Sequence, residues 1–265
     1  MITFMTNTRL DKARSAYRTG DISLNQQAHS PHAIAHSLKE EHATGSLSDV
    51  ILGGQDGLVN VLGVILGVAA ASGDARIIQA AGLAAAFAES VSMGAVAYTS
   101  TLADSEHYQS ELAREKWEIE HNPAGEKEEI RQIYLKRGFS GQLLSDVVAK
   151  ITADQKVWTE VMMAEELKLS PIPKNQAFKS AAVVGVSAIV GSLIPLFPFF
   201  ILPVMSGIYS ALTVSAITLF LVGVYKAQAT VGKWYRSGLE MTAIGMVSAM
   251  AGYAVGALFK APVVP

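Results

Sequence analysis

Two carboxylates lie inside apolar segments of this chain that are long enough to cross a lipid bilayer. Asp56 belongs to the segment 49–71 and Glu89 to the segment 77–103, and both segments are rich in small and aliphatic residues. A charged side chain at the centre of a membrane costs about 2.5–3.5 kcal/mol even on lenient insertion scales. Such residues persist where they face the interior of a helix bundle and serve binding or transport.

A methionine follows the second carboxylate at a spacing of one helical turn. Met93 comes four residues after Glu89, so the two side chains share one face of a helix. A carboxylate oxygen beside a thioether sulfur favours a borderline divalent transition metal over Na⁺ or Ca²⁺. With Asp56, these residues predict that the chain transports a metal ion.

The composition is typical of a membrane protein. Of the 265 residues, 50% are hydrophobic and 17% are charged, and the mean hydropathy is +0.31, whereas charged residues make up about 25% of an ordinary soluble domain. The net charge of −2 offers nucleic acid no electrostatic footprint, so we expect no nucleic-acid partner. The absence of cysteine excludes disulfides and thiolate metal sites, and the polar N-terminus is not that of a cleaved signal peptide.

Five apolar segments have the roughly 17–25 residues that a membrane-spanning helix needs. We therefore predict an all-α integral membrane protein with five transmembrane helices in a lipid bilayer. Before the first span, residues 1–30 are polar and expected to be irregular, and an amphipathic helix over 31–46 is expected on the membrane surface. The spans are predicted at residues 49–71, 77–103, 180–197, 199–224 and 240–259.

The distribution of lysine and arginine predicts the orientation of the spans. The N-terminal arm carries five such residues and the stretch 104–179 carries eleven, whereas the turn after the first span has only Arg76. By the positive-inside rule, the N-terminus and the long insert are cytoplasmic and the C-terminus lies outside. The predicted parts are a cytoplasmic arm and amphipathic helix over 1–46, spans one and two over 47–103, a cytoplasmic helical metal-binding insert over 104–177, and spans three to five over 178–265.

Glycines are dense in the first and fifth spans, and small residues let membrane helices approach closely. Two interpretations stay open for them: tolerant packing within one chain, or a glycine-rich face for a dimer. The glycines concerned are Gly63, Gly67, Gly245, Gly252 and Gly256.

The insert begins with a row of acids on one predicted helix face, which continues from the second span. Such a row is either a solvated acidic face or a set of carboxylates that hold cations between them. Residues 122–125 and 137–141 contain helix-breaking glycines, so that further helices are expected from Glu126, over 142–149 and over 152–169. The acids of the first face are Asp104, Glu111, Glu115 and Glu118.

Two adjacent methionines, Met162 and Met163, accompany Glu166 near the end of the insert. They are either packing residues against Trp158 or thioether ligands, and carboxylates with thioethers favour Fe(II), Mn(II), Co(II) or Zn(II) over Mg²⁺. We expect metal binding to fall as the carboxylates protonate, near the reference pKa of about 4.3, or lower if metal holds them ionised.

Other motifs give weaker signals. Glu118 and His121 form one Glu-x-x-His unit, but a diiron bundle uses this unit twice. The chain has neither a phosphate-binding loop nor a nucleophile elbow, so we expect no enzymatic activity and no bound cofactor. Four histidines at near-helical spacing are more typical of a solvated face than of a metal site: His29, His32, His36 and His42.

Three stretches together resemble the vacuolar iron transporter family, which includes plant and yeast vacuolar importers and bacterial relatives. They are residues 48–58, 89–94 and 104–112, and the similarity extends over about residues 31–260. The resemblance implies five spans, a homodimer with the transport path at its interface, and exchange of cytosolic Fe(II), often also Mn(II), for protons.

The resemblance also implies which residues bind metal. The family's first-span aspartates correspond to Asp49 and Asp56, and its second-span methionine corresponds to Met93. Its second-span glutamate corresponds to Ala85, so Glu89 is the only acid of this span here. The family's cytoplasmic ligands correspond to Glu115, Glu118, Glu126, Glu129 and Glu166, with Met162 and Met163 as its methionine pair.

We therefore expect a transporter that exports cytosolic Fe(II), with Mn(II), Co(II) and Zn(II) as further candidate substrates, in exchange for protons. Two rival functions stay open: a membrane-anchored metal buffer or sensor, and a divalent-metal channel. An anchor needs neither Asp56 nor Glu89, and a channel does not use a pH gradient to drive metal uphill. The first thirty residues resemble those of bacterial members, which favours a bacterial inner membrane over a vacuole.

Overall fold

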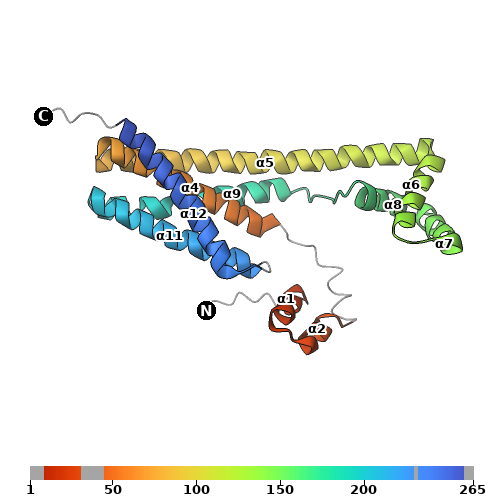
Figure 1. The fold of residues 1–265 in the computed structure, drawn as a ribbon. Coiled ribbons are helices and arrows are strands. Elements are labelled where there is room, and N and C mark those ends of the chain that lie inside the picture. The colour runs from red at the N-terminus through yellow and green to blue at the C-terminus, as the bar shows by residue number, and fades with distance from the viewer. Residues whose placement is uncertain (1–8, 31–44, 230–231, 260–265) are drawn as a thin grey trace. The chain divides into compact units, whose positions relative to one another are not determined.

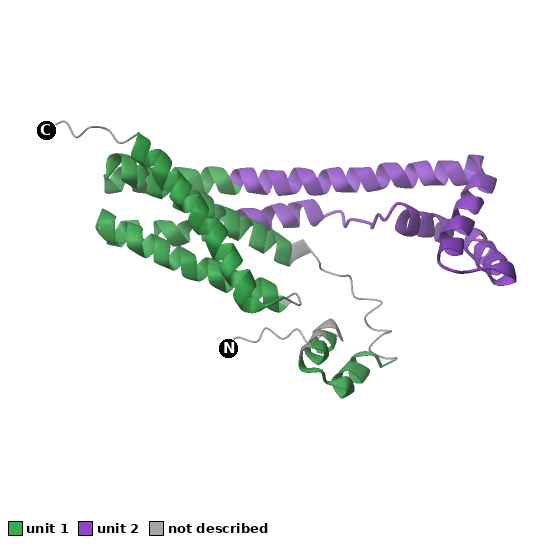
Figure 2. Ribbon diagram, in the orientation of Figure 1, with its two compact units in different colours: residues 1–90, 186–265 green, residues 91–185 purple. Residues whose placement is uncertain are grey.

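The computed structural model describes residues 9–30, 45–229 and 232–259, and every regular element within these ranges is a helix. Figure 1 labels the longer ones. The chain forms two compact units (Figure 2). One comprises residues 1–90 and 186–265, and the other comprises residues 91–185. The all-α fold predicted from the sequence is confirmed for the described residues.

Within the described part of the chain, five helices are long and apolar enough to cross a membrane, which confirms the predicted number of spans. The second of them, α5, continues past its apolar part as one helix of 47 residues. At 1.5 Å per residue it is about 70 Å long, more than twice the roughly 30 Å hydrocarbon core. The five helices are α4 (Gly45–Ser72), α5 (Ala75–His121), α9 (Gln176–Leu196), α11 (Val204–Ala229) and α12 (Trp234–Leu258).

A tight turn separates the first two spans. Gly73 has a φ of 65°, a left-handed conformation that glycine adopts without strain. Asp74 then caps α5, because its Oδ1 accepts hydrogen bonds from the backbone N–H groups of Arg76 (2.7 Å) and Ile77 (3.3 Å). The turn at Gly73 thus follows the end of α4 directly, and the cap at Asp74 begins α5.

The fourth span begins at Val204, so the predicted start at residue 199 was wrong. Residues Pro198–Ile201 instead form a short separate helix, α10. Leu202 is extended (φ −119°, ψ 151°) because the residue before a proline, here Pro203, is excluded from the helical region. Gln79 of α5 donates a 2.7 Å hydrogen bond from Nε2 to the carbonyl of Phe199 and so stabilises this turn.

Glycines allow α4 and α12 to pack backbone to backbone. A Cβ atom on Gly67 would lie 2.8 Å from the carbonyl oxygen of Gly252, and one on Gly256 would overlap the carbonyl of Gly67. Figure 1 shows the two helices crossing within one chain. The glycine face of α4 is therefore occupied by α12, which favours packing within the chain over a glycine-rich dimer face.

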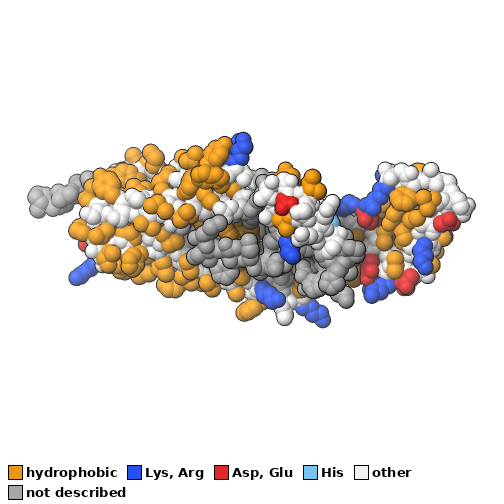
Figure 3. Space-filling model, turned by 90° about the horizontal axis from the view of Figure 1, so that it is seen from below, with side chains coloured by type: hydrophobic (Ala, Val, Ile, Leu, Met, Phe, Trp, Pro, Cys, Tyr) orange, Lys and Arg blue, Asp and Glu red, His pale blue; other side chains and the backbone are white. Residues whose placement is uncertain are grey.

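Apolar side chains on the outer surfaces of the spans are exposed, as a lipid solvent requires. Figure 3 shows hydrophobic side chains covering much of the visible face of these helices. The exposed side chains include Val186, Val190, Ile217, Leu221, Val247 and Met250.

The N-terminal arm was expected to be irregular, and this prediction was wrong for residues 9–30. They form α1 (Arg9–Thr19) and α2 (Ile22–Ala28), with Ala16 and Ala28 buried. Asp21 caps α2 by accepting a 3.0 Å hydrogen bond from the N–H of Leu24. Of the amphipathic helix predicted over 31–46, residues 31–44 lie outside the described residues, as do His32, His36 and His42.

The insert contains short helices packed around a core of its own. They are α6 (Pro123–Lys136), α7 (Gly141–Thr152), α8 (Gln155–Val161) and the π-helix η1 (Met162–Glu166). The helix predicted over 152–169 is thus divided at Met162. The core comprises Ile119, Ile130, Leu144, Val148, Trp158 and Met162.

We predict that Gly67→Ala destabilises the protein in detergent by about 1–3 kcal/mol, the usual cost of forcing an extra carbon into a packed interface. The control is Gly63→Ala on the same helix, because its Cβ would meet the carbonyl of Ser248 at an ordinary 3.7 Å. Thermal unfolding of the two variants makes the comparison. Equal unfolding temperatures would contradict the proposed backbone contact.

Candidate metal sites

A pair of polar side chains links the first two spans inside the apolar segments. Asn60 of α4 donates a hydrogen bond from Nδ2 to Oε1 of Glu89 on α5, at 2.7 Å. The carboxylates of Asp56 and Glu89 are also close enough to interact electrostatically. The structure thus brings together the two membrane acids predicted from the sequence.

Asn60 was missed by the sequence analysis, although a signal for it was present. It follows Asp56 by four residues and therefore lies on the same face of α4. An amide can orient Glu89 through its N–H group and can offer its own carbonyl oxygen to a cation.

This polar face of α4 is not covered by the other residues that the structure describes. Asn60 is exposed, Asp56 is partly exposed, and Leu52 and Val64 on the same stripe are 53% and 40% exposed. Asp49, the other first-span candidate, is partly exposed on this stripe as well. The opposite sides of α4 pack against α12 and, through Gly57, against the carbonyl of Ala188 in α9.

Met93 follows Glu89 by one turn of α5 and is partly exposed. Its neighbour Gly94 has a close contact of its own, since a Cβ there would lie 3.2 Å from the carbonyl of Ala181. The thioether is therefore accessible on a helix whose backbone is held closely against α9.

The insert contains a group of three carboxylates that converge. One oxygen each of Glu115, Glu118 and Glu126 lies within 4.8 Å of the other two, a spacing that a single cation can bridge. Glu115 is 1% exposed and Glu126 is 5% exposed. Their Oε2 atoms accept no hydrogen bond from any residue that the structure describes. Buried, unpaired carboxylate oxygens are costly unless a cation or a proton neutralises them.

The start of α6 places Glu126 in this group. Asn122 caps the helix, with its Oδ1 accepting a 3.3 Å hydrogen bond from the N–H of Gly125, and Pro123 occupies the first turn. The helix thus begins at Pro123, three residues before the predicted restart. Glu126 consequently lies in the first turn, where the exposed N–H groups of the helix favour negative charge.

Two carboxyls of the insert hold protons near neutral pH. Burial, together with repulsion from Glu129 and Glu115, raises the pKa of Glu126 to about 7. Glu166 is more exposed, yet partial desolvation and the proximity of Glu129 and Glu115 raise the pKa of this carboxyl to about 7 as well. Both carboxyls therefore protonate at a higher pH than the value near 4.3 expected from the sequence.

The two methionines lie in the π-helix η1, whose defining hydrogen bond runs from the N–H of Leu167 to the carbonyl of Met162 (3.2 Å). A π-turn has one residue more than an α-turn, and such turns are frequent at functional sites. Both sulfur-bearing side chains are buried: Met162 belongs to the core around Trp158, whereas Met163 lies outside that core. Packing thus accounts for Met162, and Met163 is the better candidate for a thioether ligand.

Glu111, the first insert acid on the predicted face, does not join the three converging carboxylates. Its Oε2 instead forms an ion pair with Nε of Arg114, at 2.9 Å. The other predicted face member, Asp104, takes part in none of the ion pairs found among the described residues.

Among the described histidines, neither site candidate joins a carboxylate group. The Nδ1 of His121 lies 2.8 Å from the carbonyl of Trp117, and the two rings stack at 4.3 Å. His29 has the same type of contact with the carbonyl of Asn25. Hydrogen bonding accounts for His29, and hydrogen bonding with stacking accounts for His121.

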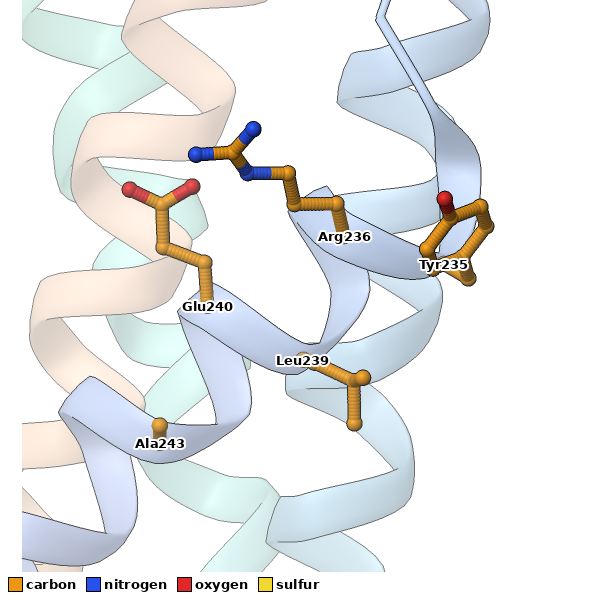
Figure 4. Close-up of a pocket in the computed structure, with 5 residues that line it drawn as sticks. All are labelled: Tyr235, Arg236, Leu239, Glu240 and Ala243. Atoms are coloured by element: carbon orange, nitrogen blue, oxygen red, sulfur yellow. The ribbon is translucent and has the colours of Figure 1, made fainter.

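An open depression on the surface of α12 is a different kind of feature. Figure 4 shows Arg236 and Glu240 projecting to one side of the helix, one turn apart. Exposed aromatic residues, Trp234 and Tyr235, precede them at the start of the span, as is common at a membrane interface.

The fold defines an integral, multi-pass membrane protein with a helical insert between its second and third spans. The family model of the VIT family matches residues 47–257, which is most of the chain. The chain therefore belongs to the VIT family, as its resemblance to vacuolar iron transporters implied.

Relatives of similar length carry that name. The vacuolar iron transporter of Plasmodium berghei is 31% identical over 272 residues, covering 97% of this chain and 98% of the relative. Vacuolar iron transporter 1 of Arabidopsis thaliana is 29% identical over 219 residues, covering 82% of this chain and 88% of the relative. The protein of the same name from Tulipa gesneriana is 30% identical over 221 residues, covering 83% and 90%.

We predict that Mn(II) binding to the insert weakens as the pH falls from about 8 to 6, because Glu126 and Glu166, each with a pKa of about 7, then retain their protons. Calorimetry on the full-length protein, in buffers of different ionisation enthalpy, also counts the protons that binding releases. Glu126→Gln should reduce that number and weaken binding.

The control is Glu128→Gln. Glu128 is fully exposed, and its hydrogen bonds with Arg131 and Gln132 lower the pKa of its carboxyl to about 2, so it carries no proton in this range. An affinity for Mn(II) that is constant between pH 6 and 8, without proton release, would contradict a role for Glu126 and Glu166 in metal binding.

Proposed function

We propose that this protein exports cytosolic Fe(II), and also Mn(II), across a membrane in exchange for protons. The observation that carries this function is the polar group of Asp56, Asn60 and Glu89 on an uncovered face within the membrane-spanning helices. A membrane anchor has no use for two acids at that depth, where charge is expensive. The name carried by the relatives supports iron as the substrate.

Metal is bound at mid-membrane by hard oxygens and one soft sulfur. Asp56 and Glu89 supply carboxylate oxygens, Asn60 orients Glu89, and Met93 supplies the thioether that favours Fe(II) over Mg²⁺ or Ca²⁺. Glu89 takes the role of the glutamate that other family members have at the position of Ala85.

Protons and metal compete for the same carboxylate oxygens. A metal ion binds the deprotonated carboxylates, and its release on the far side allows them to take up protons. Because each protonated carboxyl is neutral, the metal-free site opens again to the cytoplasm without an uncompensated charge in the membrane. This competition is sufficient to couple proton entry to metal exit.

The insert collects metal at the cytoplasmic end of the path. The unpaired buried oxygens of Glu115 and Glu126 support this role, because a divalent cation satisfies both of them at once. Glu129 and Glu166 add charge nearby, and Met163 adds a sulfur ligand. The number of basic residues in the insert and the N-terminal arm supports a cytoplasmic location for both and an external C-terminus.

Two copies of the chain enclose the path. The stripe of Asp49, Leu52, Asp56, Asn60 and Val64 is left uncovered by the other spans, and lipid is a poor solvent for its polar members. A homodimer in which the two α4 helices face each other covers both stripes and brings two sets of ligands together. A bacterial inner membrane is the proposed location.

Transport in proteoliposomes tests this function. Vesicles with an acidic lumen should accumulate Fe(II) or Mn(II) against its gradient, whereas uptake without a pH difference should stop at equilibrium. Glu89→Gln should abolish uptake, and Asn60→Ala should slow it at least tenfold, because a misoriented ligand weakens the site without removing it. Glu240→Gln on α12 controls for the loss of an acid from a span.

Downhill flux that ignores the pH gradient would identify a channel. Metal binding without any flux would identify a buffer or sensor. Normal uptake by Glu89→Gln would show that this glutamate does not replace the family's usual one.

The dimer predicts a pattern of crosslinks in a chain that has no native cysteine. Single cysteines at Leu52 or Val64, on the uncovered stripe, should form disulfide-linked dimers in the membrane. A cysteine at Val61 or Leu62, which are fully buried within the chain, should not. Full-rate transport by protein reconstituted as monomers in single-copy vesicles would contradict the dimer.

A further inference from the structure

Arg114 lies among the carboxylates of the insert and pairs with three of them at once. Its Nε is 2.9 Å from Oε2 of Glu111, and its Nη2 is 2.7 Å from Oε1 of Glu115. Its Nη1 pairs with Oε2 of Glu118. One guanidinium thus engages three acids with three different nitrogen atoms.

Two of these acids, Glu115 and Glu118, belong to the three converging carboxylates. Arg114 therefore pairs with two of the three carboxylates that a divalent cation would bridge. A cation that takes both oxygens of Glu115 and one of Glu118 has to displace at least part of this guanidinium.

The exposure of the partners shows which of them can move. The side chain of Arg114 is 41% exposed, whereas that of Glu115 is 1% exposed. The guanidinium can swing into solvent on its flexible stem, but the buried carboxylate is held in place by its surroundings.

We propose that Arg114 is an internal competitor for the metal: it holds the insert carboxylates together and is displaced when a divalent cation binds. This inference rests on the proposed metal-collecting role of the insert. Two consequences follow from the chemistry of the guanidinium.

The first consequence concerns selectivity by charge. A K⁺ ion carries the same single charge as the guanidinium but donates no hydrogen bonds, so it gains nothing by displacing Arg114. A divalent ion brings twice the charge and displaces the guanidinium.

The second consequence concerns the release of metal. The returning guanidinium limits the affinity of the insert for the metal and lets captured metal move on to the membrane path.

Mn(II) calorimetry on the full-length protein tests the proposal. Glu89→Gln is present in every variant, so that the heat reports the insert. Arg114→Gln should lower the Kd for Mn(II) by about fivefold, the change that the loss of one partly exposed ion pair corresponds to. Arg114→Lys keeps the positive charge but loses the several donor nitrogens of the guanidinium, so it should lower the Kd by a smaller factor.

The matched control is Arg131→Gln. Arg131 is equally exposed and belongs to the same unit, but it pairs with Glu128 at 2.6 Å, outside the converging carboxylates. Its Kd for Mn(II) should stay within about twofold of the parent.

A second readout separates competition from a structural role. At constant ionic strength, replacing a bulky organic cation by K⁺ should weaken Mn(II) binding to Arg114→Gln but not to the parent or the Arg131→Gln control. Unchanged or weaker Mn(II) binding by both Arg114 variants would overturn the proposal and make Arg114 a structural residue. A parent protein that binds no Mn(II) would overturn the metal-collecting role of the insert and this inference with it, while leaving the membrane site untouched.

Discussion

The structure depends on one electrostatic constraint: a carboxylate removed from water has to be neutralised by a proton, a metal ion or a cationic side chain. Glu89 in the spans and Glu115 and Glu126 in the insert are subject to it. Glu89 has the amide of Asn60 and the neighbouring carboxyl of Asp56. Glu115 has Arg114 on one oxygen, whereas Glu126 keeps its proton near neutral pH. In the insert, Glu115 is therefore paired with a cationic side chain and Glu126 with a proton, and both solutions are reversible.

Because each counter-charge can leave its carboxylate, metal ions and protons can exchange there. A proton bound with a pKa of about 7 is lost or gained at the pH of a cytoplasm, and an exposed arginine moves without unfolding its surroundings. The rest of the chain holds the acids in place. Glycine-mediated packing makes the bundle around α4 rigid, and the core around Trp158 and Met162 supports the insert. Rigid surroundings keep each carboxylate desolvated, which is what makes the exchange of its counter-charge favourable.

Much of this architecture could be predicted from the sequence, because apolar length alone identifies a membrane span. The continuation of α5 beyond the membrane was also predicted, from helical spacing of the acids. Partners in packing were not predictable. Small residues permit a close approach of two helices, but nothing in the sequence around Gly67 indicates that Gly252 is its neighbour. The start of the fourth span was misplaced because apolar composition continues through Pro198–Ile201, where only backbone geometry ends the helix.

The candidate sites divide in the same way. Residue types indicated the acids and methionines, whereas burial decides their properties. The raised pKa of Glu126 follows from its burial and from the acids around it, and no local pattern indicates that it is buried. Arg114 was overlooked because a single arginine among acids reads as ordinary surface charge. The two short helices of the N-terminal arm were missed because polar sequences of that length have weak intrinsic preference, and burial of Ala16 and Ala28 stabilises them.

The central claim is that protons and metal ions replace each other on the same carboxylates during transport. Its most direct test records metal entry and lumenal pH together in proteoliposomes that start without a pH difference. On addition of Mn(II), the account predicts that the lumen becomes more alkaline as metal enters, with a constant ratio of protons to metal. Glu89→Gln should abolish both signals. Metal entry at full rate with no change in lumenal pH would contradict the account.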